Sequence, residues 1–286
     1  MSTESEVITR IENGVGRITL NRSKAIHALN RAMCEAMIEA LLAWRADDAV
    51  QSVLIDHAGE RGFCAGGDIR MIAESGAGDA SEAKAFFKAE YQLNHLMFVY
   101  PKPITAVVDG IVMGGGVGIS EPADVRIATE RTTYAMPETG IGLFPDVGGG
   151  WFLPRLPGQT GVWLALTGAR LKAADTVALG IHTHFVDSGA IGALTGELLA
   201  APADPESGPN ALSPRGCRHG HSPFFAGFSV RSSRFGSGSP WKMPFEASLR
   251  IEARCRMVVG ELAASSRRMS SSVLRFWISA CRLAAF

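Results

Sequence analysis

The chain has 286 residues, of which 47% are hydrophobic, and its 28 Lys and Arg residues balance its 28 Asp and Glu residues. A net charge of zero gives no reason to expect nucleic acid as a partner, and no apolar run reaches the roughly 20 residues that cross a membrane. The length suffices for one large domain, or for two small ones, each with its own core.

The five cysteines are odd in number and widely spaced, and none forms a Cys-x-x-Cys pair. This pattern is typical of reduced thiols in a cytosolic protein rather than of a disulfide framework. The acidic N-terminus, MSTESEVI, has neither the apolar stretch of a secretion signal nor the arginines of an import sequence. We therefore expect a cytoplasmic location.

The first third of the chain predicts a hairpin, a helix and a buried strand. Strands over 7–11 and 15–20 flank Asn13-Gly14, a pair suited to a tight turn, and residues 21–24 form a loop. Asn30 is placed to cap a helix whose apolar face is Met33, Met37, Leu41 and Trp44. A buried strand is expected over 53–55.

Two glycine turns follow, and each leads into a helix. The first, within residues 61–68, contains Gly66-Gly67 and precedes a helix over 69–73. Residues 76–80 are predicted to be mobile, and a long helix over 81–99 carries Glu90. The second turn, residues 114–116, comes after a buried strand over 104–108. Glycine lets backbone approach a ligand closely, and a helix start leaves N–H groups unpaired, so either turn suits a developing oxyanion.

Two acids stand shortly after the second glycine turn. Glu138 follows Pro137 and Asp146 follows Pro145, so a proline fixes the backbone before each carboxylate. Donors for negative charge together with two rigid carboxylates indicate an acyl-transfer or enolate site. Short helices over 161–166 and 173–179 and a strand over 184–186 complete an alternation of strands and helices, which predicts the α/β class.

Each of these signals also has a simpler interpretation. Three glycines in a row are more often a tight turn than an oxyanion site, and an acid on a long helix such as Glu90 is usually on the solvated face. Asp68 has the position of a helix cap. Cys64 has no histidine placed nearby, which favours a packing role. The histidines, including His182 and His184, show no metal-ligand spacing, so structural roles rather than a metal site are expected.

Five motifs in order resemble the crotonase (enoyl-CoA hydratase/isomerase) superfamily, and within it the 3-hydroxyisobutyryl-CoA hydrolases. They are NRSKAIHALN, FCAGGDI, KPITAVVDGIVMGGGVG, ADVRIAT and YAMPETGIGLFPDVGGG, and the resemblance covers about residues 5–190. It implies a spiral of ββα units with a helical C-terminal region. It also implies that CoA lies between these units and that the thioester carbonyl is held by two backbone amides.

The resemblance assigns roles to particular residues. The amides of Gly67 and Gly115 would form the oxyanion hole, and Glu138 and Asp146 would be the catalytic glutamate and the aspartate typical of the hydrolases. Glu90 would be a further acidic site residue. Backbone on the CoA side of the substrate would come from Lys24, Ala25, His27, Ala65 and Gly66.

One departure separates the subfamilies. Hydratases carry a second catalytic glutamate three residues after the middle glycine of the triplet, where this chain has Gly118. The resemblance therefore favours hydrolysis of a 3-hydroxyacyl-CoA, most similar to the breakdown of 3-hydroxyisobutyryl-CoA in valine catabolism. The alternatives are an enoyl-CoA hydratase or isomerase, and a catalytically dead CoA-binding truncation product. No cofactor is expected, because CoA belongs to the substrate; a homo-oligomer is left open.

The last part of the chain differs from the rest. Residues 205–286 carry 12 basic and 4 acidic side chains, whereas the first 204 carry 16 basic and 24 acidic. We expect a crotonase-like domain over 1–200 and an atypical Ser/Gly/Arg-rich tail over 201–286 in place of the family's C-terminal helices. Such a composition is typical of a disordered extension, and it would also result from translation out of frame.

Overall fold

The computed structural model describes residues 5–200 of the chain. The predicted tail, residues 201–286, lies outside the described residues, so the predicted boundary at residue 200 stays a prediction. The described residues divide into two compact units, one formed by residues 5–134 and 171–200 and the other by residues 135–170.

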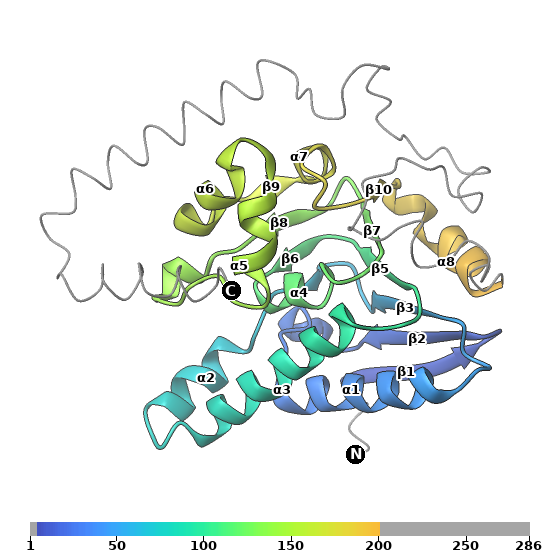
Figure 1. The fold of residues 1–286 in the computed structure, drawn as a ribbon, viewed down its shortest axis with the longest axis horizontal. Helices are drawn as coiled ribbons and strands as arrows, with labels where there is room; N and C mark the ends of the chain where they lie inside the picture. Colours follow the sequence, from blue (N-terminus) through green and yellow to red (C-terminus); the bar gives the residue numbers. More distant parts are fainter. Residues whose placement is uncertain (1–4, 201–286) are drawn as a thin grey trace, which may run out of the picture. The chain divides into compact units, whose positions relative to one another are not determined.

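The larger unit is built from a repeated strand–strand–helix pattern (Figure 1). The elements in chain order are β1 (Val7–Glu12), β2 (Val15–Leu20), α1 (Arg31–Ala46), β3 (Ser52–His57), β4 (Gly62–Cys64), α2 (Ile69–Gly76), α3 (Ser81–Phe98), β5 (Ile104–Val108), β6 (Ile111–Met113), α4 (Gly115–Gly118), β7 (Val125–Ala128) and β8 (Thr133–Ala135). After the second unit the chain continues with β9 (Leu171–Lys172), α7 (Ala173–Ala178), β10 (His184–Phe185) and α8 (Ile191–Ala200). The predicted α/β class is confirmed.

Two sheets are formed, one of six strands in the order β1-β2-β3-β5-β7-β10 and one of four strands in the order β4-β6-β8-β9. The first hairpin, β1 and β2, lies in the six-stranded sheet. In the next three strand pairs, β3–β4, β5–β6 and β7–β8, the first strand joins the six-stranded sheet and the second joins the four-stranded sheet. Neighbours from β2 onward in the first sheet are parallel, as are β4 and β6 in the second. Because the connections repeat, corresponding loops of successive repeats leave the sheets at the same edge.

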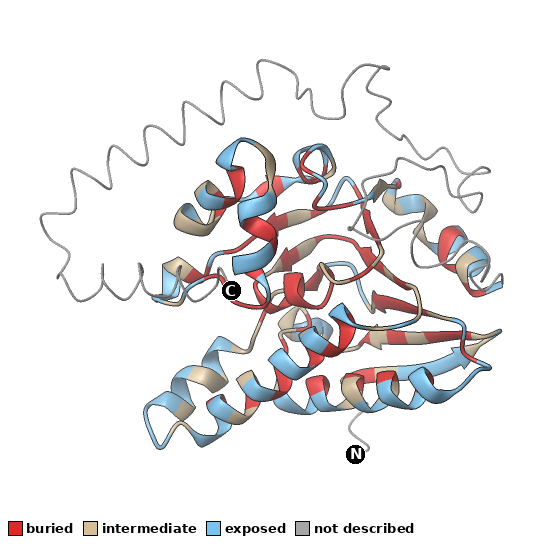
Figure 2. Cartoon of the chain, viewed as in Figure 1, coloured by how far each residue is buried: buried red, intermediate tan, exposed pale blue. Residues whose placement is uncertain are grey.

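The predicted hairpin and first helix are confirmed with small changes at their ends. β1 and β2 pair in antiparallel fashion around Asn13 and Gly14, both of which have a positive φ. The Asn30 side chain accepts a hydrogen bond from the Met33 amide at 2.9 Å and so caps α1. The predicted face of α1 is buried, and its opposite face is exposed (Figure 2). α1 packs along α3, which also contacts α2 (Figure 1).

An apolar cluster joins the six-stranded sheet to the last helix of the unit. α8, which the sequence analysis did not predict, contributes Leu194 and Leu199. They pack with side chains of four strands and the residue after β10, namely Val15, Leu54, Val107, Val125, Ile127 and Val186. Full burial of one such side chain contributes about 1.5–3 kcal/mol, so the cluster fixes α8 on the sheet.

The smaller unit, residues 135–170, consists of short helices. It contains a 3-10 helix over Glu138–Ile141, then α5 (Gly149–Phe152) and α6 (Thr160–Thr167), the last within one residue of its predicted bounds at each end. A side chain at Gly161 would stand 1.7 Å from the carbonyl oxygen of Leu153. Glycine at this position therefore allows α6 to pack directly on the preceding backbone.

No helix among the described residues is long and apolar enough to cross a membrane.

Gly16 on β2 tests the packing of α1 on the sheet. A Cβ at Gly16 would stand 2.4 Å from the ring of buried Trp44, so the ring would have to move. We expect Gly16→Ala to lower the free energy of unfolding by about 1–3 kcal/mol, measured by urea denaturation. Gly76→Ala is the matched control, because nothing lies within 4 Å of that position. Equal effects of the two substitutions would contradict the packing described.

Candidate active site

The two predicted glycine turns leave neighbouring parallel strands at the same edge. β4 pairs with β6, with Gly62 opposite Ile111 and Cys64 opposite Val112, and each strand ends at its glycine turn. A Cβ on Gly66 would lie 3.4 Å from the amide nitrogen of Gly115. The two turns are therefore in direct contact.

Each turn uses its first glycine for backbone geometry. Gly66 has a φ of 104° and Gly114 a φ of 49°, values that side chains disfavour. The glycine that follows, Gly67 or Gly115, then presents its amide. A Cβ on Gly115 would lie 3.3 Å from the Gly67 nitrogen, so the two amides are neighbours.

Both of these amides lack a hydrogen-bond acceptor among the described residues. Gly67 forms a parallel bridge with Leu29, in which the Leu29 amide donates to Gly66 and the Asp68 amide donates to Leu29. In this pattern the N–H of Gly67 itself points away from Leu29. Gly115 is the first residue of α4, where amides have no intrahelical acceptor. Two adjacent amides that are free to donate can stabilise one oxyanion.

Glu90 lies directly beside these amides. Its side chain is buried on α3, and a Cβ on Gly115 would stand 2.2 Å from its Oε1. The interpretation of Glu90 as an acid on a solvated helix face is therefore wrong. Any side chain at Gly115 would collide with this carboxylate, which is a second reason for glycine there.

The segment predicted to line the CoA side runs along the first glycine turn. Lys24 is exposed, and Ala25 is half-buried. The amide of Ala65 donates to the carbonyl of Ile26 at 2.9 Å, and the amide of Leu29 donates to the carbonyl of Gly66 at 2.7 Å. The structure therefore brings residues 24–29 and the turn 65–68 together.

His27 is buried with both ring nitrogens in use. Its Nδ1 accepts a hydrogen bond from the Arg22 amide at 2.9 Å, which leaves Nε2–H to donate to the Ala58 carbonyl at 2.8 Å. Burial lowers the pKa of His27 to about 4, and the nearby ring of His57 adds to this effect. The imidazole is therefore neutral, and both of its nitrogens are occupied. The backbone of His27 is engaged as well, because its amide donates to the carbonyl of Arg22 at 3.0 Å.

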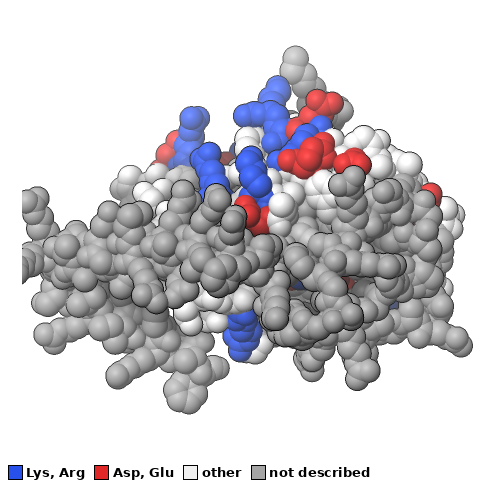
Figure 3. All heavy atoms as spheres, turned by 90° about the horizontal axis from the view of Figure 1, so that it is seen from above, with Lys and Arg blue, Asp and Glu red and all other residues white. Residues whose placement is uncertain are grey.

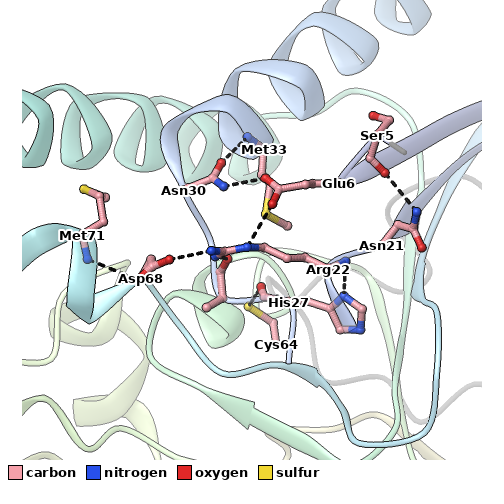
Figure 4. Close-up of polar contacts among 11 residues, drawn as sticks. Ser5, Glu6, Asn21, Arg22, His27, Asn30, Met33, Cys64, Asp68 and Met71 are labelled. Carbon is pink, nitrogen blue, oxygen red and sulfur yellow. Dashed lines mark hydrogen bonds and ion pairs between the residues drawn. The ribbon is translucent and has the colours of Figure 1, made fainter. Parts of the chain in front are cut away.

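Cys64, at the end of β4, is fully buried. Its thiol donates to the carbonyl of His27 at 3.1 Å (Figure 4). Burial raises the pKa of Cys64 to about 12. The thiol stays protonated at neutral pH, which agrees with packing rather than with a nucleophile. Cys34 is also free and buried.

Glu138 and Asp146 both belong to the smaller unit, and both are buried. Neither carboxylate oxygen of Glu138 has a hydrogen-bond partner among the described residues. Burial, with a smaller contribution from the charge of Asp146, raises the pKa of Glu138 to about 7. Desolvation is the larger cause of this shift, and repulsion by Asp146 is the smaller one. A carboxylate with such a pKa is suited to general base catalysis near neutral pH.

No group of three potential metal ligands occurs among residues 5–200. His182 is buried, and its ring makes an edge contact with Tyr134.

On the face seen in Figure 3, basic and acidic side chains of the described residues lie next to one another, so this face is not uniformly basic.

Sequence reasoning missed the role of Arg22, which it placed in a loop. The guanidinium of Arg22 contacts Asp68, the residue after Gly67, at 2.8 Å (Figure 4). Asp68 also caps α2, as the sequence suggested, by accepting a hydrogen bond from Met71. An arginine in a polar loop carries no periodic signal, so its partner 46 residues away was not predictable.

Comparison with known proteins identifies close relatives. The chain is 51% identical over 195 residues to a protein of Danio rerio named 3-hydroxyisobutyryl-CoA hydrolase, mitochondrial, and 48% identical to the Homo sapiens protein of that name. Each match covers 68% of this chain, but only 51% and 50% of the respective relatives. The chain spans about half the length of the curated relatives it matches.

Solved structures share the fold. A carnitinyl-CoA dehydratase from Mycobacterium thermoresistibile is 43% identical with a TM-score of 0.68, and an enoyl-CoA hydratase from Rhodobacter sphaeroides is 39% identical with a TM-score of 0.67. Both comparisons cover 77% of this chain and 64% of the other. The sequence profile of the enoyl-CoA hydratase/isomerase family matches residues 15–220. With the repeated strand–strand–helix units and two glycine turns described above, the chain belongs to the enoyl-CoA hydratase/isomerase family.

Proposed function

We propose that the protein hydrolyses a 3-hydroxyacyl-CoA thioester, converting 3-hydroxyisobutyryl-CoA to 3-hydroxyisobutyrate and CoA in valine catabolism. The observation that carries this proposal is the pair of adjacent, unpaired amides of Gly67 and Gly115. They occur in a chain that is 51% and 48% identical, over 68% of its length, to two proteins named for this reaction. The buried base Glu138 supports it as well.

The amides act on the carbonyl oxygen of the thioester. When a nucleophile attacks the carbonyl carbon, negative charge develops on this oxygen, and the N–H groups of Gly67 and Gly115 donate to it. Loss of one such donor typically costs about 2.7–4 kcal/mol of transition-state stabilisation. The amides require no reorganisation, because the strands β4 and β6 hold them in place before the substrate arrives.

Glu138 takes part in the attack on the carbonyl carbon in one of two ways. As a general base it takes a proton from water while the water oxygen bonds to the carbonyl carbon; the C–S bond then breaks, and the CoA thiolate leaves and is protonated. As a nucleophile it displaces CoA directly and forms an anhydride, which water then hydrolyses. Both routes need the ionised carboxylate.

The remaining predicted site residues bind the substrate. Asp146 would hold the 3-hydroxyl group, and Glu90 would lie beside the acyl group, since it is adjacent to Gly115. The backbone of Lys24, Ala25, His27, Ala65 and Gly66 would contact the CoA portion. The reaction as proposed uses no cofactor, and an acyl-CoA is its only partner; nucleic acid and membrane are not required.

A hydratase or isomerase is the second candidate, because the solved relatives carry hydratase and dehydratase names. Gly118 stands where the resemblance places the second glutamate of hydratases, which favours hydrolysis. A dead CoA-binding product is the third. The predicted cytoplasmic location stays a prediction, and the relatives named above are called mitochondrial.

Thiol release from a panel of acyl-CoA esters tests the activity. We expect release of free CoA to be fastest with 3-hydroxyisobutyryl-CoA, and to be lost in Gly115→Ala, whose new methyl group would meet Glu90 and crowd the Gly67 amide. Hydration of crotonyl-CoA without thiol release would instead support the hydratase. Binding of CoA with turnover of no ester would support the dead binder.

The raised pKa of Glu138 predicts a pH dependence. We expect kcat to fall as pH drops through about 7, because protonation removes the base. Glu138→Gln should lower kcat by about 10²–10⁴ and abolish this dependence. A second readout does not involve catalysis. The pKa of Glu138 in the folded protein lies above the ordinary value of 4.5, so the folded state binds this proton more tightly than the unfolded state. The wild type should therefore lose stability as pH rises from 4.5 to about 7, and Glu138→Gln should not. If the melting temperatures of the wild type and of Glu138→Gln changed with pH in the same way, the assignment would be contradicted.

Asp146 is predicted to determine the preference for the hydroxyl group. Asp146→Asn should reduce the ratio of kcat/KM for the 3-hydroxyacyl ester over its deoxy analogue, and should also slow turnover. Glu138→Gln is the matched control and should keep the wild-type ratio. If Asp146→Asn keeps the ratio and Glu138→Gln loses it, the two carboxylates have been assigned the wrong way round.

A further inference from the structure

We propose that Arg22 is a positioning residue for the oxyanion site: its guanidinium clamps the segment 25–29 to the glycine turn 65–68 and thereby fixes the direction of the Gly67 amide. This inference rests on the proposed function.

The guanidinium of Arg22 joins three separate parts of the larger unit. Nη2 donates to Oδ2 of Asp68 at 2.8 Å, and Nη1 donates to the carbonyl oxygen of Ala28 at 2.8 Å. Nε lies 3.0 Å from Oε1 of Glu6, which precedes β1. Figure 4 shows Arg22 between Glu6 and Asp68. Only arginine presents several donors in one rigid plane, so lysine cannot make all of these contacts at once.

The contact with Asp68 acts on Gly67 through the backbone. The direction of the Gly67 N–H is set by the two peptide groups beside it, and these are held because Gly66 accepts from Leu29 and Asp68 donates to Leu29. The side chain of Arg22 holds the same two backbone segments together, because it donates to the carbonyl of Ala28 and to the carboxylate of Asp68. The backbone bridge and the Arg22 contacts therefore both restrain the position of the Gly67 amide.

The segment that Arg22 holds is strained, which explains the need for a second restraint. Ile26 and His27 both have a left-handed backbone, with φ values of 49° and 51°. Such conformations in residues other than glycine cost on the order of 1–3 kcal/mol and persist only where the surroundings enforce them. The backbone amide of Arg22 also donates to Nδ1 of His27, so Arg22 holds the strained residues from both sides.

The charges around the clamp favour its persistence. Burial tends to raise the pKa of Asp68, but the hydrogen bond and charge of Arg22, together with the backbone amides of Met71 and Arg70, hold this pKa below its usual range. Glu6 is in turn held by the side chain of Asn30, the cap of α1, at 2.6 Å. Without Arg22, two carboxylates would face the segment with no cation between them.

Steady-state kinetics of the full chain test the proposal. We expect Arg22→Met to lower kcat for the 3-hydroxyacyl ester by about 10–100-fold with little change in KM, because a small displacement of the amide acts mainly on the transition state. Arg22→Lys should recover part of the loss. It keeps the charge between the carboxylates but reaches fewer acceptors.

Arg17→Met is the matched control. Arg17 makes a similar ion pair, with Nε and Nη2 3.0 and 2.7 Å from Oδ2 of Asp56, but it joins β2 to β3 and not the glycine turn. We expect this variant to lose thermal stability while kcat stays at the wild-type value. An equal fall in kcat for both variants would reduce the role of Arg22 to general stability and overturn the proposal.

Hydrogen exchange keeps the two hypotheses distinguishable. Amides of residues 25–29 and 65–68 should exchange faster in Arg22→Met than in the wild type, and at the wild-type rate in Arg17→Met. If the wild type hydrolyses no ester, the proposed function fails, and exchange alone decides the positioning role. Unchanged exchange in Arg22→Met, or an active wild type with kcat unaffected by the substitution, overturns it.

Discussion

The bridge between Leu29 and Gly67 is the constraint on which the candidate site depends. It uses the amides of Leu29 and Asp68 and the carbonyls of Gly66 and Leu29. These four polar backbone groups on the Leu29 side of the turn are thereby paired, as buried backbone requires. The unpaired N–H of Gly67 is left on the other side, where Gly115 and Glu90 lie. The bridge therefore pairs the backbone groups next to the Gly67 amide and leaves this amide itself free to donate.

The repeat explains why there are two such donors. β4 and β6 hold the same position in successive strand–strand–helix units, and each is followed by a glycine pair. One glycine takes the positive φ and the next gives its amide. Because parallel neighbours end at the same edge, a single local motif used twice yields two amides in contact. Both donors are backbone amides, so glycine, which has no side chain, can supply them.

Much of this was predictable, and the exceptions have physical causes. Periodic apolar faces and a capping residue were sufficient to predict α1 and the first hairpin, and both glycine turns were predicted as a site for negative charge. The strands β4, β6, β7 and β8 span three or four residues each, too few for an alternating pattern to be recognised. The burial of Glu90 and the contacts of Arg22 depend on partners distant in sequence, which local patterns do not reveal. The roles of the site residues themselves stay predictions.

The buried thiol under the first glycine turn has a chemical consequence of its own. The proposed reaction releases CoA, a thiol, beside a turn that begins directly after Cys64. Disulfide exchange needs a thiolate that a second sulfur can reach. Cys64 is fully buried, donates its proton to the carbonyl of His27, and has a pKa of about 12. The same burial that packs the turn therefore protects the protein from forming a mixed disulfide with its own product under oxidising conditions.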